Sequence, residues 1–475
     1  MKYLLGILLS AIFTTAAFAQ PNKFVGIWEG DLNAGMQQLR LVFNITRDES
    51  GKLSAAMQSP RQSVTFIPAD TIFTSEDVFF IEMRKFNISF SGKLVNDSNI
   101  SGKFTQGQPF DLQLKKVEKA TAVNKPQRPQ TPKPPFPYKS LDISFTNKDQ
   151  SIKFGATLSL PDTSGSKKYP AVVLITGSGA QDRDETIFGH KPFAVIADHL
   201  TKQGFAVLRV DDRGVGRSTG NFSKSTSADF ANDTEAALDY LLKNKFIDPK
   251  NVGLIGHSEG GQIAPMVAAR RKEVKFIVLL AGPGLTGAEV LATQNTAIYQ
   301  AGGVSKAAAF EYGVMYFNLA LDVVKAKDSA QALQNALDIL RNWHVADTVK
   351  KQFNLTTEAG IQAFAKPFVK ELYTPWFRFF VNYDPAPVLK KLSCAVLALN
   401  GSQDLQVISE WNLNGIRNAL AQSKTKNYEI KEIPQLNHLF QTCKKCTLDE
   451  YASLEESFSP AALDIMTGWL LKQVN

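Results

Sequence analysis

Beyond about residue 140, the chain alternates between short, continuously apolar runs and longer segments of helix-forming composition. The apolar runs have the character of strands buried on both faces, and they are 171–175, 205–210, 252–255, 276–280 and 394–399. Helical segments lie between them, for example at 192–203, 228–243 and 262–271. Two segments of alternating polarity, 141–145 and 152–160, predict antiparallel opening strands. The pattern therefore predicts an α/β fold with a mostly parallel sheet wrapped by helices.

Residues from about 24 to 118 follow a different pattern, in which apolar and polar positions alternate over short segments. Examples are 39–45, 78–83 and 86–90, separated by turn-forming Asn, Asp, Gly and Ser. This pattern predicts a small all-β domain, either a barrel or a sandwich. Gly26 and Trp28 resemble the Gly-x-Trp of lipocalin-like barrels, so its aromatic residues either line a ligand pocket or fill a small core.

Prolines are concentrated between Lys125 and Pro137, where the chain can sustain neither a helix nor a strand ladder. We therefore expect an extended Pro-rich linker at 121–138, between a small β domain at 20–120 and an α/β domain at 139–475. A helical segment at about 285–385 interrupts the predicted strands and is expected to form a lid. Its aromatic residues either line the substrate pocket or pack the lid onto the body; they are Phe364, Phe368, Tyr373, Trp376, Phe377, Phe379 and Phe380.

The N-terminus combines Lys2, an apolar run at 4–13 and a small-x-small pair, Ala17 and Ala19, as is typical of a secretory signal peptide at 1–19. No stretch is long and apolar enough for a bilayer span, so we expect an exported protein, periplasmic or extracellular, without stable membrane insertion. A hydrophobic content of 44% over 475 residues is that of a globular protein. The net charge of +8 comes from scattered basic residues, which argues against a nucleic-acid partner.

Candidate chemistry centres on Ser258. It follows the apolar run 252–255 and precedes a helical segment, so the local order is strand, tight turn, helix, as expected of a catalytic serine turn. Gly256 and Gly260 flank it and leave space for a strained backbone. The amide of Glu259, at the start of the helix, is expected to point toward a negative oxygen formed at the serine. The alternative is an ordinary glycine-containing turn.

Loops at the carboxyl ends of parallel strands collect binding residues, and two such loops add to this site. The loop after 171–175 is rich in glycine, and the amide of Ser178 or Gly179 is expected to meet an oxyanion from the other side. The loop 211–218 lacks the Lys-Ser/Thr of a phosphate loop. We interpret it as a turn and ion-pair network that shapes the site, with a direct catalytic role as the alternative.

A catalytic serine needs a base, and the chain has five histidines. His438 is the best candidate, because it lies in a loop after the strand-like segment 428–433. The others are placed less well: His257 adjoins the serine and must point away from it, His199 sits in a predicted helix, and His190 and His344 lie in an early loop and in the lid. Asp404, in the turn after 394–399, is expected to orient the base, and Asp384, before Pro385, is the runner-up.

Together, Gly177-Ser178-Gly179 and the motif from Gly256 to Gly261 make residues from about 140 to 475 resemble an α/β-hydrolase. More narrowly, they resemble bacterial secreted esterases near the serine aminopeptidase-like hydrolases. The chain order Ser258, Asp404, His438 is the order expected on this sheet. Many members carry His-Gly-Gly where this chain has Thr176-Gly177-Ser178, which leaves the first oxyanion donor open between Ser178 and Gly179. The resemblance implies a serine hydrolase that acts through an acyl-enzyme.

We expect a small-molecule ester as substrate, because an amide also demands protonation of a poor leaving amine. His438 would remove the proton of Ser258 as it attacks the acyl carbonyl. We expect no cofactor and no metal, since the histidines and cysteines form no convincing ligand set. The alternatives are a serine peptidase or aminopeptidase, a thioesterase on the same fold, and a non-catalytic ligand-binding protein on a hydrolase shell.

Cys443 and Cys446 follow His438 closely, and Cys394 falls in a predicted buried strand. We interpret the pair as a local disulfide in an oxidising compartment. The alternatives are a zinc site, which lacks two further ligands, and a thioredoxin-like redox motif, which belongs at the start of a helix in a different fold.

Overall fold

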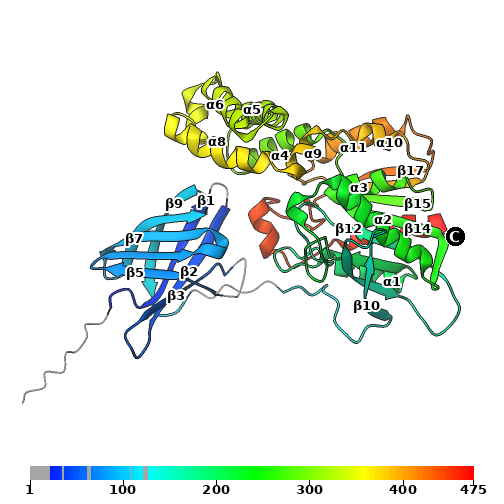
Figure 1. Ribbon diagram of the computed structural model, residues 1–475, viewed down its shortest axis with the longest axis horizontal. Coiled ribbons are helices and arrows are strands. Elements are labelled where there is room, and N and C mark those ends of the chain that lie inside the picture. The colour runs from blue at the N-terminus through cyan, green and yellow to red at the C-terminus, as the bar shows by residue number, and fades with distance from the viewer. Residues whose placement is uncertain (1–21, 35–36, 61–65, 107, 121–126, 475) are drawn as a thin grey trace, which may run out of the picture. The chain divides into compact units, whose positions relative to one another are not determined.

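The computed structural model describes residues 22–34, 37–60, 66–106, 108–120 and 127–474 (Figure 1). They divide into two compact units, the first within residues 1–123 apart from 35–37, and the second from Asn124 onward. The predicted signal peptide at 1–19 lies outside the described residues.

The described strands of the first unit form a nine-stranded antiparallel sheet in the order β4-β3-β2-β1-β9-β8-β7-β6-β5. The strands are β1 (Gly26–Ala34), β2 (Gln37–Arg47), β3 (Leu53–Gln58), β4 (Ile67–Pro68), β5 (Thr71–Ser75), β6 (Val78–Met83), β7 (Ile88–Asn96), β8 (Asn99–Gln106) and β9 (Gln108–Val117). Trp28, Phe43, Phe79 and Phe90 are fully buried in its core. The Trp28 indole donates to the Phe24 carbonyl at 2.7 Å. These aromatic side chains therefore act as core packing.

The second unit is described from residue 127 to 474, and there eight strands form one sheet in the order β10-β11-β13-β12-β14-β15-β16-β17. The strands are β10 (Lys139–Thr146), β11 (Lys153–Leu160), β12 (Tyr169–Ile175), β13 (Ala206–Val210), β14 (Ile247–His257), β15 (Val274–Leu280), β16 (Ala395–Gly401) and β17 (Tyr428–Ile433). The pairs β10/β11 and β11/β13 are antiparallel and the others are parallel. The predicted α/β fold with antiparallel opening strands is confirmed.

Helices cover both faces of this sheet, and each face has its own apolar core. One face packs against α2 (Ser227–Lys243), α3 (Glu259–Ala268), α10 (Ala386–Leu389) and α11 (Ser409–Leu420). The other packs against α1 (Pro192–Lys202) and α12 (Pro460–Val474). Helix α3 begins directly after Ser258, earlier than the sequence pattern indicates. None of the helices in the described ranges combines the length and hydropathy needed to cross a bilayer.

A helical insertion between β15 and β16 forms a lid with a core of its own. Its helices are α4 (Gly287–Ala301), α5 (Lys306–Lys325), α6 (Ser329–Arg341), α7 (Asp347–Gln352), α8 (Glu358–Leu372) and α9 (Pro375–Asn382). Figure 1 shows α4 and α9 at the end of the lid nearest α3 and α11, with α5, α6 and α8 grouped beyond them. The lid therefore presents α4 and α9 to the body of the second unit.

The Pro-rich segment belongs to the second unit from residue 127 and is anchored there by side chains. The Arg128 guanidinium donates to the carbonyls of Phe188, Ala452 and Leu454 at 3.0, 2.7 and 2.5 Å. The Gln130 side chain accepts from the Ser457 amide at 2.6 Å. The described part of the predicted linker therefore packs against the second unit.

We expect Arg128→Ala to lower the free energy of unfolding by about 2–3 kcal/mol, because three half-buried carbonyls lose a charged donor. Exposed Lys133 in the same segment is the matched control, and Lys133→Ala is expected to stay within about 0.5 kcal/mol of the parent protein. Denaturant unfolding of the full-length variants measures both values. Equal losses for the two substitutions would contradict the anchoring role.

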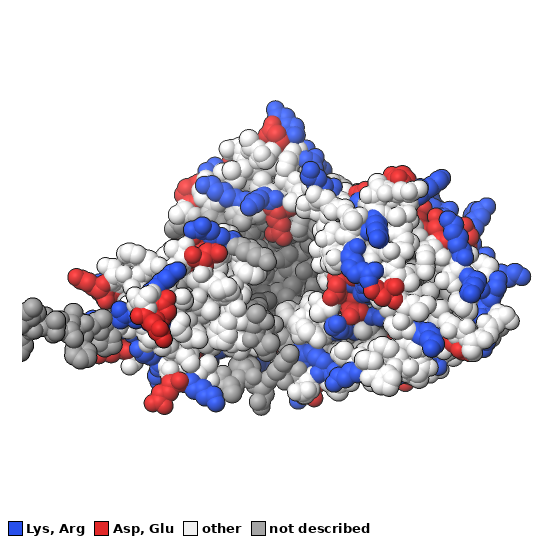
Figure 2. Space-filling view, turned by 60° about the horizontal axis from the view of Figure 1, so that its bottom comes forward, with Lys and Arg blue, Asp and Glu red and all other residues white. Residues whose placement is uncertain are grey.

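Charged side chains are mixed over the surface that Figure 2 presents. Lys and Arg alternate there with Asp and Glu, and no broad area of one sign is visible. Nucleic-acid binding by phosphate contacts requires a basic patch or stripe. This face therefore offers no electrostatic footprint for a nucleic acid.

Candidate active site

Ser258 lies at the junction of β14 and α3, with backbone angles φ 53° and ψ −116°. A positive φ is strained for a side-chain-bearing residue and is held in place by tight packing around it. A Cβ atom on Gly256 would lie 1.9 Å from the Gly260 carbonyl oxygen, and one on Gly260 would lie 2.2 Å from the Ile175 carbonyl oxygen. Both positions therefore require glycine for close backbone approach.

His438 and Asp404 come together from the loops after β17 and β16. The His438 Nδ1 atom lies 2.7 Å from Asp404 Oδ2, and both residues are buried. Asp404 Oδ1 accepts from the amides of Gln406 and Val407 at 2.7 and 2.9 Å, which fixes the carboxylate. Donation from Nδ1 to this carboxylate selects the tautomer whose Nε2 is free to accept a proton. The imidazole therefore has the arrangement of a general base.

Ser258 and His438 line the same cavity, which measures about 220 Å³. Among the described contacts, the Ser258 hydroxyl makes no hydrogen bond to His438. Such hydrogen bonds are often long before substrate binds. The structure therefore brings the three predicted catalytic residues together at one site.

The three candidate oxyanion donors differ in whether they line the cavity. Ser178 and Glu259 line the cavity, whereas Gly179 is not among its lining residues. The neighbouring Gly177 amide already donates to Glu185 Oε1 at 2.7 Å. Glu259 is the first residue of α3, where helix amides lack intrahelical acceptors. The geometry therefore favours the amides of Ser178 and Glu259 as the pair that meets an oxyanion.

The turn after β13 forms an ion-pair network behind the cavity. Asp211 accepts from the Arg183 guanidinium at 2.6 and 2.9 Å and from the Arg217 amide at 3.0 Å. Asp212 accepts from the Thr176 hydroxyl at 2.8 Å. Burial raises the pKa of Asp212 to about 8, although two hydrogen bonds oppose the shift. Neither aspartate lines the active-site cavity, so this network holds loops in place.

The remaining histidines and the runner-up aspartate have other partners. His190 is fully buried against Ser457 and Tyr451, and burial lowers its pKa to about 4. His199 contacts Thr467, and His344 is exposed beyond α6. Asp384 is exposed and accepts from the Ala386 amide, as a turn-starting residue does. None of these residues competes for the roles expected of His438 and Asp404.

The lid aromatics divide between the two expected roles. Trp376, Phe377 and Phe380 of α9 line the cavity. The others pack within the lid or on its edge, namely Phe364, Phe368, Tyr373 and Phe379. Helix α4 adds Val290, Leu291 and Gln294 to the cavity wall, three residues that are not among the predicted site residues. Their spacing in the sequence places these three residues on one face of a helix, and this spacing is the pattern that could have identified them.

A hydrogen bond connects the lid to the residue after the nucleophile. The Trp376 indole donates to Glu259 Oε1 at 2.8 Å, and the Ser227 hydroxyl donates to the same oxygen at 2.6 Å. Burial raises the pKa of Glu259, although hydrogen bonds from Ser227, Trp376 and Ser178 oppose the shift. Helix α9 is thereby held against the start of α3.

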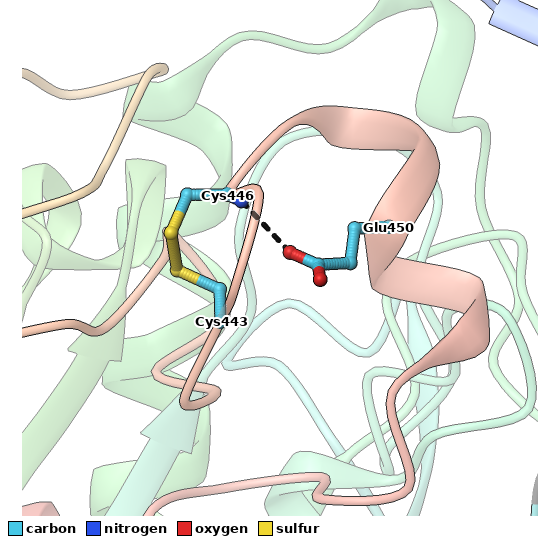
Figure 3. A group of neighbouring side chains, drawn as sticks. All are labelled: Cys443, Cys446 and Glu450. Carbon is cyan, nitrogen blue, oxygen red and sulfur yellow. Dashed lines mark hydrogen bonds between the residues drawn. A yellow bond between two sulfur atoms is a disulfide. The ribbon is translucent and has the colours of Figure 1, made fainter.

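Cys443 and Cys446 form a disulfide in the segment that follows the His438 loop (Figure 3). The ligand atoms of both cysteines and Glu450 lie within 4.8 Å of one another, which is close enough for a metal. The sulfurs are bonded to each other, however, and Glu450 Oε2 accepts from the amides of Lys444, Lys445 and Cys446. These three residues therefore stabilise the turn and do not form a metal site. Cys394 is free and buried, and burial raises its pKa to about 11.

We expect replacement of both Cys443 and Cys446 by serine to lower kcat clearly and to lower the melting temperature only slightly. The bridge closes a very short loop, so its loss costs at most about 2 kcal/mol. The Cys443 amide donates to the Gln435 carbonyl at 3.1 Å, at the base of the His438 loop, so a several-fold fall in kcat is expected. Thermal melting and steady-state kinetics with and without reductant measure the two effects. Two free thiols in protein purified from an oxidising compartment would contradict this role.

The sheet order, the serine turn after β14 and the Asp and His loops after β16 and β17 define an α/β-hydrolase. Residues 150–427, more than half of the chain, match the X-Pro dipeptidyl-peptidase (S15) family. The chain belongs to this family. The match includes Ser258 and Asp404 and ends before His438.

Three individual relatives share a quarter or less of their aligned residues with this chain. Esterase EstD of Thermotoga maritima is 25% identical over 330 residues, which are 69% of this chain and 68% of that protein. The structure of Est1E from Butyrivibrio proteoclasticus with ferulic acid aligns with 18% identity and a TM-score of 0.40, over 70% of this chain and 99% of that chain. The Pyrococcus furiosus esterase Pf2001 aligns with 15% identity and a TM-score of 0.42, over 75% and 100%. The family match and the EstD similarity support a serine hydrolase.

Proposed function

We propose that this protein is an exported carboxylic-ester hydrolase that acts through Ser258, His438 and Asp404. The observation that carries the proposal is the 2.7 Å contact between His438 and Asp404, at a cavity that Ser258 also lines. His438 accepts the serine proton as the hydroxyl attacks the acyl carbonyl, and then gives it to the leaving alcohol. The amides of Ser178 and Glu259 hold the oxyanion, and water releases the acid.

The cavity wall favours neutral substrates with an apolar acyl group. Its lid side is largely apolar and aromatic, with Val290, Leu291, Trp376, Phe377 and Phe380. Its carboxylates belong to Glu185 and Glu259, and no Lys or Arg is among the described residues that line it. An acyl group that carries a carboxylate would find no Lys or Arg partner there, because the one cationic candidate, His257, is already paired with Glu185.

A peptidase is the second candidate, and two observations favour it. The family description names an X-Pro dipeptidyl-peptidase. Carboxylates in the wall also suit a substrate with a free amino group. Against it stands the similarity to Esterase EstD, which supports an ester.

Export is proposed from the N-terminal pattern at 1–19 and from the Cys443–Cys446 disulfide, which suits an oxidising compartment. Expression of the full-length gene followed by N-terminal sequencing of the mature protein tests it. A protein that keeps Met1 and stays inside the cell would contradict export.

The two hydrolase candidates are separated by one panel of chromogenic substrates. Purified protein is assayed with nitrophenyl esters from acetyl to dodecanoyl, with aminoacyl anilides and with an X-Pro anilide, and the Ser258→Ala variant serves as the background control. We expect kcat/KM for the best ester to exceed that for any anilide by at least about 10²-fold. The reverse order would replace the esterase by the peptidase.

A further inference from the structure

His257, the residue before the nucleophile, makes two hydrogen bonds to groups on other loops. Its Nε2 lies 2.9 Å from the His438 carbonyl oxygen, and its Nδ1 lies 3.0 Å from Glu185 Oε1. The side chains of His257 and Glu185 are only 8% and 5% exposed. Both groups are therefore largely withdrawn from solvent, which strengthens the two bonds.

These contacts determine how many protons the pair carries. A carbonyl oxygen only accepts, so Nε2 must bear a proton. A neutral imidazole then has a bare Nδ1, which would face a carboxylate oxygen that already accepts from the Gly177 amide at 2.7 Å. A proton between Nδ1 and Oε1 satisfies the contact. Because Oε1 also accepts from the Gly177 amide, an ionised carboxylate with a doubly protonated ring fits both bonds better than a carboxylic acid with a neutral ring.

The pair connects three loops around Ser258. Through Nε2, His257 holds the main chain of His438, whose side chain Asp404 holds at Nδ1. Through Oε1, Glu185 holds the Gly177 amide, one residue before the proposed oxyanion donor Ser178. The rings of His257 and His438 lie 4.9 Å apart. One buried ion pair thus reaches both the base and the oxyanion loop.

We propose that His257 and Glu185 form a buried imidazolium–carboxylate pair whose role is to position the base loop and the oxyanion loop on either side of Ser258. The proposal rests on the proposed function, because it assigns positioning residues to the same site. Neither residue is assigned a bond-making step. Their effect on the reaction is through His438 and Ser178.

The pH dependence of the pair follows from the groups that face His257. The titratable or charged ones among the described neighbours are Glu185, His438 and Asp404, while α1, β15 and the segment before α12 present apolar side chains. Burial lowers the pKa of His257, but the Glu185 charge and hydrogen bond outweigh it, so the pKa is raised above 6.5. The stabilisation is therefore complete below pH 6.5 and is lost as the pH rises through the raised pKa.

Glu185→Gln tests the positioning role in the full-length protein. The amide removes the charge, so His257 becomes neutral and its Nδ1 needs a donor, whereas the Gly177 amide needs an acceptor. Both contacts fall on the atom at the Oε1 position, so one of them is lost. We expect kcat to fall about 10- to 100-fold with KM within about 3-fold, since small misplacement of reacting groups is costly. Glu185→Asp keeps the charge and should recover part of the rate. His199→Gln replaces another partly buried histidine, outside the site, and should leave both constants unchanged.

A second pair of measurements does not depend on turnover. In protein with ¹⁵N-labelled histidine at about pH 7.5, a histidine with protons on both ring nitrogens should be observed, and His257→Gln should remove that signal. The melting temperature of Glu185→Gln should lie below that of the parent, with a gap that narrows as the pH rises. A singly protonated His257, or an unchanged kcat in Glu185→Gln while the parent hydrolyses its substrate, overturns the pair. An inactive parent with a doubly protonated His257 would instead overturn the proposed function alone.

Discussion

Ser258→Ala is expected to abolish ester hydrolysis while leaving the fold intact. The substitution removes the atom that forms the acyl-enzyme and deletes one oxygen from a cavity wall. The loss of kcat/KM should be at least about 10³-fold. His438→Gln should be about as damaging, and Asp404→Asn somewhat less, because the imidazole keeps its place but loses its charged partner.

Circular dichroism and thermal melting of the same preparations show whether the fold is kept. Protein must be free of host esterases, since a trace contaminant would mimic residual activity. A Ser258→Ala preparation with the activity of the parent protein would show that this serine is not the nucleophile. An unfolded variant would leave the question to the histidine and aspartate substitutions, which act on the same reaction from different loops.

Gly260→Ala is expected to destabilise the second unit strongly. The added Cβ would meet the Ile175 carbonyl oxygen at 2.2 Å, and both atoms belong to packed backbone that cannot move aside cheaply. Overpacking of this kind costs about 3 kcal/mol or more. The serine turn would be displaced with it, so activity should fall together with stability.

Gly468→Ala is the matched control, because Gly468 is an exposed glycine in the interior of α12 with no atom within 4 Å of an added Cβ. There the substitution should stabilise the protein by about 0.5–1 kcal/mol, through a smaller loss of backbone entropy. Denaturant unfolding of both variants gives the comparison. A Gly260→Ala protein as stable as the parent would show that the tight strand-to-helix turn is not required.

The sheet and the candidate catalytic residues were predictable because their signals are local. Continuous apolar runs such as 276–280 are unusual outside strands buried on both faces, and β15 (Val274–Leu280) covers that run. His438 could be chosen because few histidines compete for the role and each has a sequence neighbourhood that limits it. The assignment of roles to Ser258, His438 and Asp404 remains a prediction that kinetics must test.

The features that the sequence did not reveal depend on tertiary contacts. The Pro-rich composition around Arg128 indicates an extended chain, but its anchors are carbonyls of Ala452 and Leu454, far along the sequence. The partner of His257 is Glu185, 72 residues earlier, and nothing in either local pattern links them. Which lid aromatics line the cavity likewise depends on how α9 packs, because both α8 and α9 carry phenylalanine side chains.

Active-site labelling with a fluorophosphonate tests the central claim most directly, because the reagent reacts only with a serine that a working base and oxyanion site activate. Mass spectrometry of digested protein should place one adduct on the peptide that contains Ser258, and neither Ser258→Ala nor His438→Gln should be labelled. An unlabelled parent protein, or an adduct on a different serine, would contradict the account.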